Sequence, residues 1–426
     1  MKLNTLIIGS GGREHAICRS IVKSPLSKNV FVLPGNPGTN KIANNINIPI
    51  DRFEDILKTI QEKEIDILVC GPEAPLADGL MDFLSERCPQ DSIILIGPNQ
   101  IAAQLESSKA FAKLFMQRQQ IPTAAYGIFK SENIYEAFDF IDQLNIPIVL
   151  KADGLAAGKG VLICKDKAEA REELCEMISG KFGDASRTVV IEEFLDGIEF
   201  SLFVLTDGSD FVLLPEAKDY KRIGEGDTGL NTGGMGSVSP VSFFDETLKE
   251  KVLESIVKPT ILGLQKENIP YCGFIFFGLI VVKGEPFVIE YNVRMGDPET
   301  ESVFPRIQSD VVDLFYRCGT HRLADYNMKI DPNYCTTIIL ASGGYPEAFE
   351  KGKSILIPEE FNEDLMMFHS GTRLSGESLQ TNGGRVLAIS SMGKNKNAAI
   401  EKCKEMAEKI QYEGKYYRKD IGFDLE

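Results

Sequence analysis

The sequence has few histidines, and its cysteines do not occur in the CxxC spacing. His15, His321 and His369 are the only histidines, too few for a histidine-rich metal site. Nine cysteines are scattered from Cys18 to Cys403. This pattern indicates reduced, mostly buried thiols and argues against a disulfide framework or a zinc site.

Long apolar runs and an excess of basic residues are also missing. No stretch approaches the ~20 apolar residues of a membrane span, and the start MKLNTLIIGSGG lacks the features of a signal peptide. We therefore expect a cytoplasmic protein that does not bind a membrane. The net charge of −16 argues against binding to nucleic acid, although it also simply favours solubility. Anionic substrates would need local basic or glycine-lined pockets.

The 426 residues, 43% hydrophobic and 25% charged, have the composition of a soluble globular protein of about three domains. In the first hundred residues, the strand candidates TLIIG, VFVLPG, IDILVCGPE and SIILIGP alternate with helical stretches over 13–23, 53–63 and 76–87, which predicts a parallel α/β domain. From Pro122 long β-rich runs predict antiparallel sheets with turns at 206–208 and 282–285. The glycine-rich stretch RIGEGDTGLNTGGMGSVSP is nearly devoid of strand formers, which predicts a long loop. Further strands and the helix NKNAAIEKCKEMAEKIQ follow from about residue 328.

The stretch TLIIGSGGREHAI, residues 5–17, predicts a strand, a glycine turn and a helix. It differs from a dinucleotide-binding fingerprint, because Glu14 occupies the place of the third glycine and no carboxylate follows the next strand at Leu33. An NAD-dependent dehydrogenase is therefore disfavoured. A glycine turn at a helix start can hold a phosphate through its free N–H groups, but a tight turn without a ligand is an equally good reading.

The stretch IPIVLKADGLAAGKGV places Lys151 at the end of a buried strand, before a loop with Gly154, Gly158 and Gly160. Glycines let backbone N–H groups approach a triphosphate, and lysines supply positive charge. The Walker A spacing is absent. A flexible hairpin with a solvated Lys159 is the alternative, although an unpaired lysine closing an apolar strand would be costly.

The stretch FVIEYNVRMGDPET predicts a strand on which Glu290, Asn292 and Arg294 share one face. A carboxylate and an amide oxygen suit Mg²⁺, and an arginine suits an anion beside it. The flanking FIFFGLIVV makes a plain surface strand the weaker reading. In TVVIEEFLDGIEF, the extended backbone at Glu192–Leu195 could pair with the edge of an adenine, and Glu199 could bind the hydroxyls of a ribose. An ordinary acidic turn explains this stretch equally well.

The motifs KADGLAAGKGV, VIEEFLDGIEFS, DTGLNTGGMG and GDPET, in this order, resemble the phosphoribosylamine–glycine ligases (glycinamide ribonucleotide synthetases) of the ATP-grasp superfamily. The resemblance extends from GGREHA through GPEAPLADG and QLESSKAF to TNGGRV and RKDIGF. It implies an α/β and α+β multidomain fold: a Rossmann-like pre-ATP-grasp domain over 1–103, an ATP-grasp domain over 104–327 with a lid at about 123–190, and a C-terminal α+β domain over 328–426.

The same resemblance implies a reaction, in which ATP phosphorylates the carboxylate of glycine and the amine of 5-phosphoribosylamine attacks the glycyl phosphate in purine biosynthesis. ATP is a substrate, the metal is Mg²⁺ or Mn²⁺, and the protein is a monomer or weak homodimer. Catalytic roles fall to Lys151, Glu290 and Arg294, and metal binding to Glu290 and Asn292. ATP binding is assigned to Lys109, Lys151, Gly154, Gly158, Lys159, Gly160, Glu192, Glu193, Phe194, Leu195 and Glu199. Substrate binding is assigned to Gly9, Gly11, Gly12, Asp219, Asn231, Thr232, Gly233, Gly234, Arg294, Gly296, Asp297 and Pro298.

The chain departs from the family pattern at Lys218 and Tyr220 in KDYKR, at Leu230, and at Glu301, where glutamine is common. All of these positions lie near the expected acceptor site and away from the expected ATP site. The alternatives are another ATP-grasp carboxylate–amine ligase and a non-catalytic nucleotide-binding regulator. A regulator would be expected to lose Glu290, Asn292 or Arg294, and all three are present.

Overall fold

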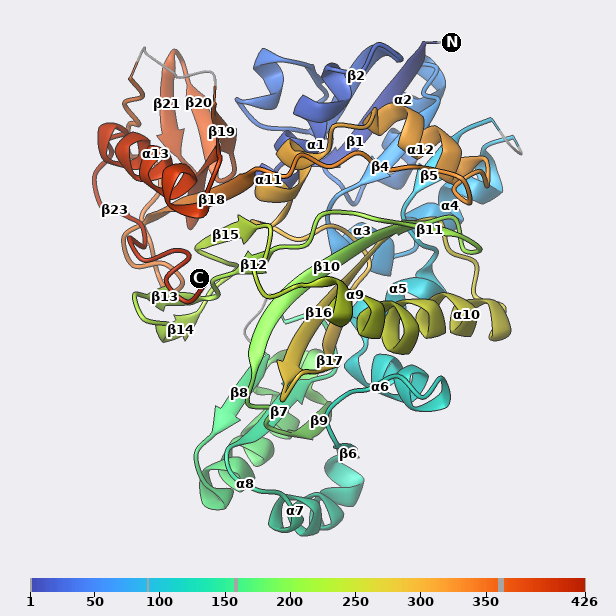
Figure 1. The fold of residues 1–426 in the computed structure, drawn as a ribbon, viewed down its shortest axis with the longest axis vertical. Coiled ribbons are helices and arrows are strands. Elements are labelled where there is room, and N and C mark those ends of the chain that lie inside the picture. Colours follow the sequence, from blue (N-terminus) through green and yellow to red (C-terminus); the bar gives the residue numbers. More distant parts are fainter. Residues whose placement is uncertain (1, 90–91, 157–159, 359–363, 426) are drawn as a thin grey trace.

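A computed structural model describes residues 2–89, 92–156, 160–358 and 364–425 (Figure 1). The N-terminal part contains a parallel sheet, as predicted, and its strand order is β3-β2-β1-β4-β5. Its strands are β1 (Leu3–Gly9), β2 (Ser27–Pro34), β3 (Asn44–Asn45), β4 (Ile67–Cys70) and β5 (Ile94–Ile96). Its helices are α1 (Gly12–Val22), α2 (Phe53–Glu62), α3 (Glu73–Ala77) and α4 (Leu80–Arg87). The single helix predicted over 76–87 is wrong, because Gly79 at φ +85° separates α3 from α4.

The central sheet is antiparallel, with the order β11-β10-β16-β17. Its strands are β10 (Ile198–Thr206), β11 (Phe211–Leu213), β16 (Gly273–Val282) and β17 (Glu285–Asn292). Lys283 and Gly284 both have positive φ, which gives the predicted tight turn between β16 and β17. The helices α9 (Glu246–Val252) and α10 (Lys258–Lys266) lie beside this sheet (Figure 1).

The helical stretch predicted to lead out of the first domain is two helices, α5 (Gln100–Ser107) and α6 (Lys109–Arg118). Ser108 has an extended backbone, and its hydroxyl accepts a hydrogen bond from the N–H of Phe111. Because this is an N-cap, a new helix starts at Lys109. The cap places Lys109 in the first turn of α6, next to the lid.

The segment expected to be a lid is a four-stranded antiparallel sheet of order β6-β9-β7-β8, covered by two helices, and is called the lid below. Its elements are β6 (Tyr126–Lys130), α7 (Ile134–Gln143), β7 (Ile148–Ala152), β8 (Val161–Cys164), α8 (Lys167–Glu176) and β9 (Thr188–Glu193). Its buried side chains, among them Ile141, Leu150 and Leu174, form a cluster of their own. The lid lies at the bottom of Figure 1, below the ends of β16 and β17.

The third large sheet has the path β12-β15-β18-β22-β19, with β23 (Lys415–Tyr416) on β18. The path consists of β12 (Lys218–Asp219), β15 (Gly236–Ser239), β18 (Tyr334–Ser342), β22 (Arg385–Gly393) and β19 (Leu365–His369), beside α13 (Lys396–Lys409). Two hairpins project from this region, β13 (Arg222–Gly224) with β14 (Thr228–Asn231), and β20 (Thr372–Ser375) with β21 (Ser378–Thr381). The prediction of a strandless loop over the glycine-rich stretch is wrong, because β13, β14 and β15 lie within it.

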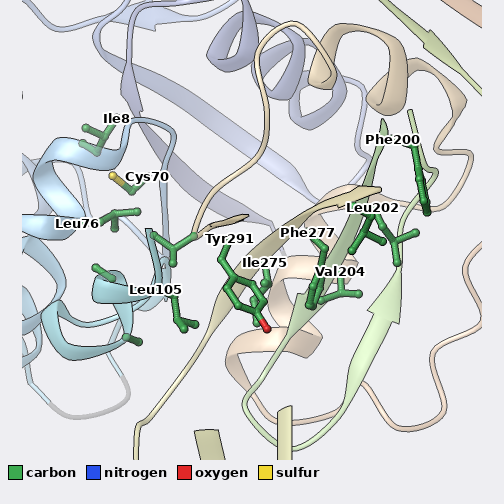
Figure 2. Packing of buried hydrophobic residues seen from close by; sticks show 14 of the residues in the cluster. Ile8, Cys70, Leu76, Leu105, Phe200, Leu202, Val204, Ile275, Phe277 and Tyr291 are labelled. Atoms are coloured by element: carbon green, nitrogen blue, oxygen red, sulfur yellow. The ribbon is translucent and has the colours of Figure 1, made fainter. Parts of the chain in front are cut away.

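The N-terminal and central parts share one core. Figure 2 shows Ile8, Cys70 and Leu76 close to Leu105 of α5, which leads to Tyr291 and Ile275 of the central sheet. The helices α11 (Thr300–Val303) and α12 (Val311–Gly319) then pack against α1 and β5 of the N-terminal part. This common packing fixes the loop 296–298, which precedes α11, relative to the N-terminal glycine turn. Within the described ranges, no helix is long and apolar enough to cross a bilayer.

Candidate active site

A buried ion-pair triad joins the lid to α6. The Glu192 carboxylate of β9 lies 2.9 Å from Lys151 Nζ of β7 and 3.0 Å from Lys113 Nζ of α6. Lys151 Nζ also donates to the carbonyl of Ile289, 3.3 Å away in the central sheet. Lys151 is thus paired, as burial of a lysine requires. Burial lowers the pKa of Lys113 to about 8 even though Glu192 favours its charged form.

Sequence reasoning did not single out Lys113, although its position one helical turn after Lys109 was a usable signal. It expected the backbone around Glu192 to meet a ligand, whereas the Glu192 side chain points inward to the two lysines. Glu193 accepts a hydrogen bond from the N–H of Ala125, 2.8 Å away. Phe194, just after β9, is exposed.

The glycine loop after β7 packs closely against the segment between α8 and β9, which contains Ala185. The N–H of Gly154 donates to the carbonyl of Ala185, 3.0 Å away, and a Cβ at Gly154 would lie 3.0 Å from Ala185 Cα. The carbonyl of Gly160 accepts from the N–H of Ala152 at 2.7 Å. Gly158 and Lys159, two predicted ATP-binding residues, lie outside the described residues.

Strand β17 presents its polar face as predicted up to its last residue. The Tyr291 hydroxyl lies 3.0 Å from Thr260 Oγ1 of α10, so Tyr291 points to the opposite face from Glu290 and Asn292. A bulge at Ile289 shifts the pairing with β16 and frees the carbonyl that Lys151 binds. The strand ends at Asn292, so the predicted extension of this strand to Arg294 is wrong.

Positive side chains surround Glu290. Lys221 Nζ lies 4.0 Å from Glu290 Oε1 and 3.5 Å from Glu199 Oε2. Burial would raise the pKa of Glu290, but Lys221, Lys109 and Lys151 together hold it below its ordinary value. Asp219 in turn raises the pKa of Lys221 well above its usual range. The glutamate is therefore ionised at neutral pH, as a metal ligand has to be.

The oxygens of Glu290 and Asn292 have the chemistry of a divalent-cation site. In the described part of the chain, no three His, Cys, Asp or Glu side chains are grouped closely enough to hold a metal by themselves. A hard cation such as Mg²⁺ typically takes one or two protein carboxylates and completes its shell with phosphate oxygens and water. The two residues fit a cation that arrives with a nucleotide.

Arg294 is held by two acids that sequence reasoning did not assign. Its guanidinium lies 2.6 Å from Glu106 Oε1 of α5 and 3.5 Å from Glu73 Oε2 of α3. Glu106 also accepts a hydrogen bond from the N–H of Val293, 2.8 Å away. Burial raises the pKa of Glu106. Both acids lie in quoted motifs, GPEAPLADG and QLESSKAF, which were the available signal. Arg294 is thereby fixed beside the polar end of β17.

The N–H of Gly11 is already hydrogen-bonded. It donates to Glu14 Oε2, 2.6 Å away, and the other Glu14 oxygen lies 2.5 Å from Arg13 Nε. Gly9, at φ +127°, has no room for a side chain because Glu14 folds over it. A phosphate at Gly11, as the sequence predicts, must displace this carboxylate or bind beside it.

Arg385 of β22 joins two of the predicted substrate loops. Its Nη1 donates to the carbonyls of Gly233 and Asp297 at 2.7 and 2.8 Å, and it lies 2.9 Å from Asp297 Oδ1. In addition, Ser237 Oγ donates to the carbonyl of Pro298 at 2.8 Å. The loops 231–234 and 296–298 therefore meet, through an arginine that sequence reasoning did not assign.

Two of the departures from the family pattern are explained by the C-terminal tail. Lys218 Nζ lies 3.2 Å from Asp424 Oδ2, and the Tyr220 hydroxyl donates to Asp424 Oδ1 at 2.8 Å. Both head groups are held by the tail, whereas Asp219 and Lys221 alternate with them and join the Glu290 cluster. Leu230 is half exposed on the hairpin β13–β14.

Comparison with known families matches three models over most of the chain. They are the phosphoribosylglycinamide synthetase N domain over residues 3–106, its ATP-grasp (A) domain over 107–300, and its C domain over 335–424. The phosphoribosylamine–glycine ligase of Vibrio vulnificus strain YJ016 is 42% identical over 426 residues, covering 99% of this chain and 98% of that protein. The Haemophilus influenzae ligase is 41% identical over 427 residues, with the same coverage.

Solved structures agree with these matches. The phosphoribosylamine–glycine ligase of Thermotoga maritima superposes with a TM-score of 0.86 at 37% identity, covering 98% of this chain and all of that one. The biotin carboxylase domain of the Hydrogenobacter thermophilus 2-oxoglutarate carboxylase gives a TM-score of 0.72 at 17% identity, over 98% and 92% of the two chains, which shows the fold alone. The chain has the ATP-grasp architecture and belongs to the phosphoribosylglycinamide synthetase family.

Proposed function

We propose that this chain joins glycine to 5-phosphoribosylamine at the expense of ATP, giving glycinamide ribonucleotide, ADP and phosphate through glycyl phosphate. The observation that carries this proposal is the set of lysines around Glu290, between the lid and the central sheet. Phosphoryl transfer needs positioning and neutralisation of charge more than a nucleophilic side chain. The full-length relatives named as phosphoribosylamine–glycine ligases support the same acid and amine.

The nucleotide is assigned to the space between the lid and the central sheet. Lys109 and Lys151 hold its phosphates, the loop 153–160 covers them, the backbone of 192–195 meets the adenine, and Glu199 meets the ribose. The triad supports this assignment because Glu192 fixes the direction of Lys151. Glu290 and Asn292 hold Mg²⁺ or Mn²⁺, which, when bound, neutralises phosphate charge and polarises the transferred group.

The acceptor substrates are assigned to the next part of the same site. Arg294, held beside β17 by Glu106, faces the anionic intermediate. The amine substrate lies between the N-terminal turn and the loops joined by Arg385; the lining residues are Gly9, Gly11, Gly12, Asp219, Asn231, Thr232, Gly233, Gly234, Gly296, Asp297 and Pro298.

We propose that the chain consists of three domains, over residues 1–103, 104–327 and 328–426, with the lid at about 123–190. The lid's separate core supports its limits. Strands β12 and β15 belong by sequence to the central unit but pair within the C-terminal sheet, so these two units are expected to move together. We further propose a cytoplasmic enzyme, a monomer or weak homodimer, without nucleic-acid or membrane partners.

The test of the proposed function is the substrate requirement of ADP release. We expect ADP only when glycine and phosphoribosylamine are both present, and ¹⁸O from the carboxylate of labelled glycine should appear in the phosphate released. Release with a different acid or amine would indicate another ATP-grasp ligase. Phosphate free of ¹⁸O would rule out glycyl phosphate.

Gly11→Val is expected to raise KM for phosphoribosylamine, or for glycinamide ribonucleotide in the reverse direction, with little change in KM for ATP. The backbone of Gly11 is extended, so a valine causes no backbone strain, but its Cβ would lie 2.9 Å from Glu14 Oε2 and 3.3 Å from Asp297 Oδ2. Steady-state kinetics of the folded variant measure this effect. A selective defect in KM for ATP, or tight NAD binding by the wild type, would show that the turn has another ligand.

The lid is expected to close on ATP. Its core is separate, and its contacts with β17 are few, among them Lys151 with the carbonyl of Ile289 and Thr123 with the carbonyl of Val288. Hydrogen exchange in peptides from 126–152 and 161–193 should slow when a non-hydrolysable ATP analogue and Mg²⁺ are added. Peptides from α13 serve as an internal control. Equal exchange in the lid with and without nucleotide would contradict closure.

A further inference from the structure

Glu301 is a buried acid without a partner at the junction of three chain segments. Its side chain, on α11, is fully buried, and among the described residues neither carboxyl oxygen has a hydrogen-bond partner. The Ser370 hydroxyl, between β19 and β20, is likewise buried and unpaired. Unpaired buried polar atoms are rare, so a group of three in one place calls for a physical explanation.

Gly12 locates this group. A Cβ placed on Gly12 would clash with Glu301 Oε1 and lie 2.8 Å from Ser370 Oγ. The carboxyl therefore fills the space between the start of α1 and the turn after β19. The neighbouring Gly11 and the loop 296–298 are parts of the proposed amine-substrate site, so Glu301 lies directly behind that site.

The surroundings of Glu301 disfavour a negative charge. Four segments that pack against α11 carry titratable or charged residues, and β15 carries none. These residues are Arg13, Glu14, His15, Cys18 and Arg19 of α1, Asp297 and Glu299 before α11, Arg306 after it, Tyr334 and Cys335 of β18, and Arg385 of β22. Burial raises the pKa of Glu301 well above its ordinary value, and Asp297 raises it further. Arg385 opposes this shift, but it is already engaged by Asp297 and the carbonyl of Gly233.

We propose that Glu301 is a positioning residue that works as a neutral acid, packing as an uncharged group between the Gly11–Gly12 turn and the C-terminal sheet so that the turn keeps the place in which the amine substrate binds. A neutral carboxylic acid offers both a donor and an acceptor and carries no charge, as is also true of a glutamine amide. An ionised Glu301 adds a negative charge behind the place where the substrate's phosphate binds. A buried carboxylate must also be hydrated, and water entering beside Glu301 would separate the Gly11–Gly12 turn from the C-terminal sheet. This inference rests on the proposed function.

The test compares wild type with Glu301→Gln across neutral and alkaline pH. In wild type, KM for phosphoribosylamine or glycinamide ribonucleotide should rise by up to about tenfold per pH unit once Glu301 ionises, whereas KM for ATP should not follow it. In Glu301→Gln this rise should be absent. Glu299, whose pKa burial raises to about 7 with a further contribution from Asp219, titrates in both proteins, so the difference between the two profiles isolates Glu301.

A matched control and a readout independent of activity complete the test. Glu377→Gln changes an exposed glutamate of the C-terminal part and should keep the wild-type profile. The difference between the infrared spectra of wild type and Glu301→Gln at neutral pH should show the loss of one protonated carboxylic acid, because Glu299 contributes to the band in both proteins. Identical pH profiles in wild type and Glu301→Gln, or no difference in that band, would overturn the inference. A wild type that is inactive with glycine and phosphoribosylamine but keeps the band would instead contradict the proposed function.

Discussion

Glu290→Gln is expected to lower kcat by on the order of 10³-fold while the protein stays folded. The reason is charge: the lysines around Glu290 keep it ionised, and a neutral amide is a far poorer ligand for a divalent cation between the phosphates of ATP. The side chain keeps its volume and is about one-third exposed, so the packing of β17 is preserved. The measurement is steady-state turnover at saturating ATP over a range of Mg²⁺ concentrations.

The same strand provides a matched control. Glu285→Gln, at the exposed start of β17, removes a surface ion pair with Lys251, 2.6 Å long, and should leave kcat within about twofold of wild type. Circular dichroism and thermal unfolding should be alike in both variants. Near-normal activity of Glu290→Gln at ordinary Mg²⁺ would remove this residue from the metal site.

Lys151→Met is expected to raise KM for ATP by roughly 10²-fold, about the strength of one or two charge-assisted hydrogen bonds. The substitution leaves Glu192 paired with Lys113, so no carboxylate is left buried without a cation, and the lid sheet should remain folded. Kinetics with varied ATP, together with direct binding of a non-hydrolysable analogue, measure the loss.

Lys130→Met, at the exposed end of β6 in the same sheet, is the control for this variant and should bind ATP like wild type. An unchanged KM for ATP in Lys151→Met would mean that the triad only stabilises the lid. A variant that loses glycine affinity alone would assign Lys151 to the acceptor side instead.

Much of the fold follows from local sequence. The alternation of β1, β2, β4 and β5 with helices predicted a parallel sheet because buried parallel strands need continuous apolar runs and crossover helices. The turn at Lys283–Gly284 was predictable because a tight hairpin turn needs residues with positive φ, which glycine adopts easily. Two of the failed predictions have a local cause, because Gly79 and Ser108 each divide a helical stretch that the periodicity would have continued. The strands β13, β14 and β15 were missed because the glycine-rich stretch is nearly devoid of strand formers.

By itself the sequence determined the family, the alternation of the long strands with helices in the N-terminal part, and the polar face of β17, because these depend on residues near one another in the chain. The tertiary structure alone decided which distant groups meet. Lys113 joins Lys151 through Glu192, Arg294 meets Glu73 and Glu106, and Arg385 joins the two substrate loops. The pairing of β12 and β15 with β18 and the burial of Glu301 also arise between distant segments. A charged or polar group can be buried only with a partner that offsets its desolvation, and spacing along the chain does not encode which partner the fold brings to it.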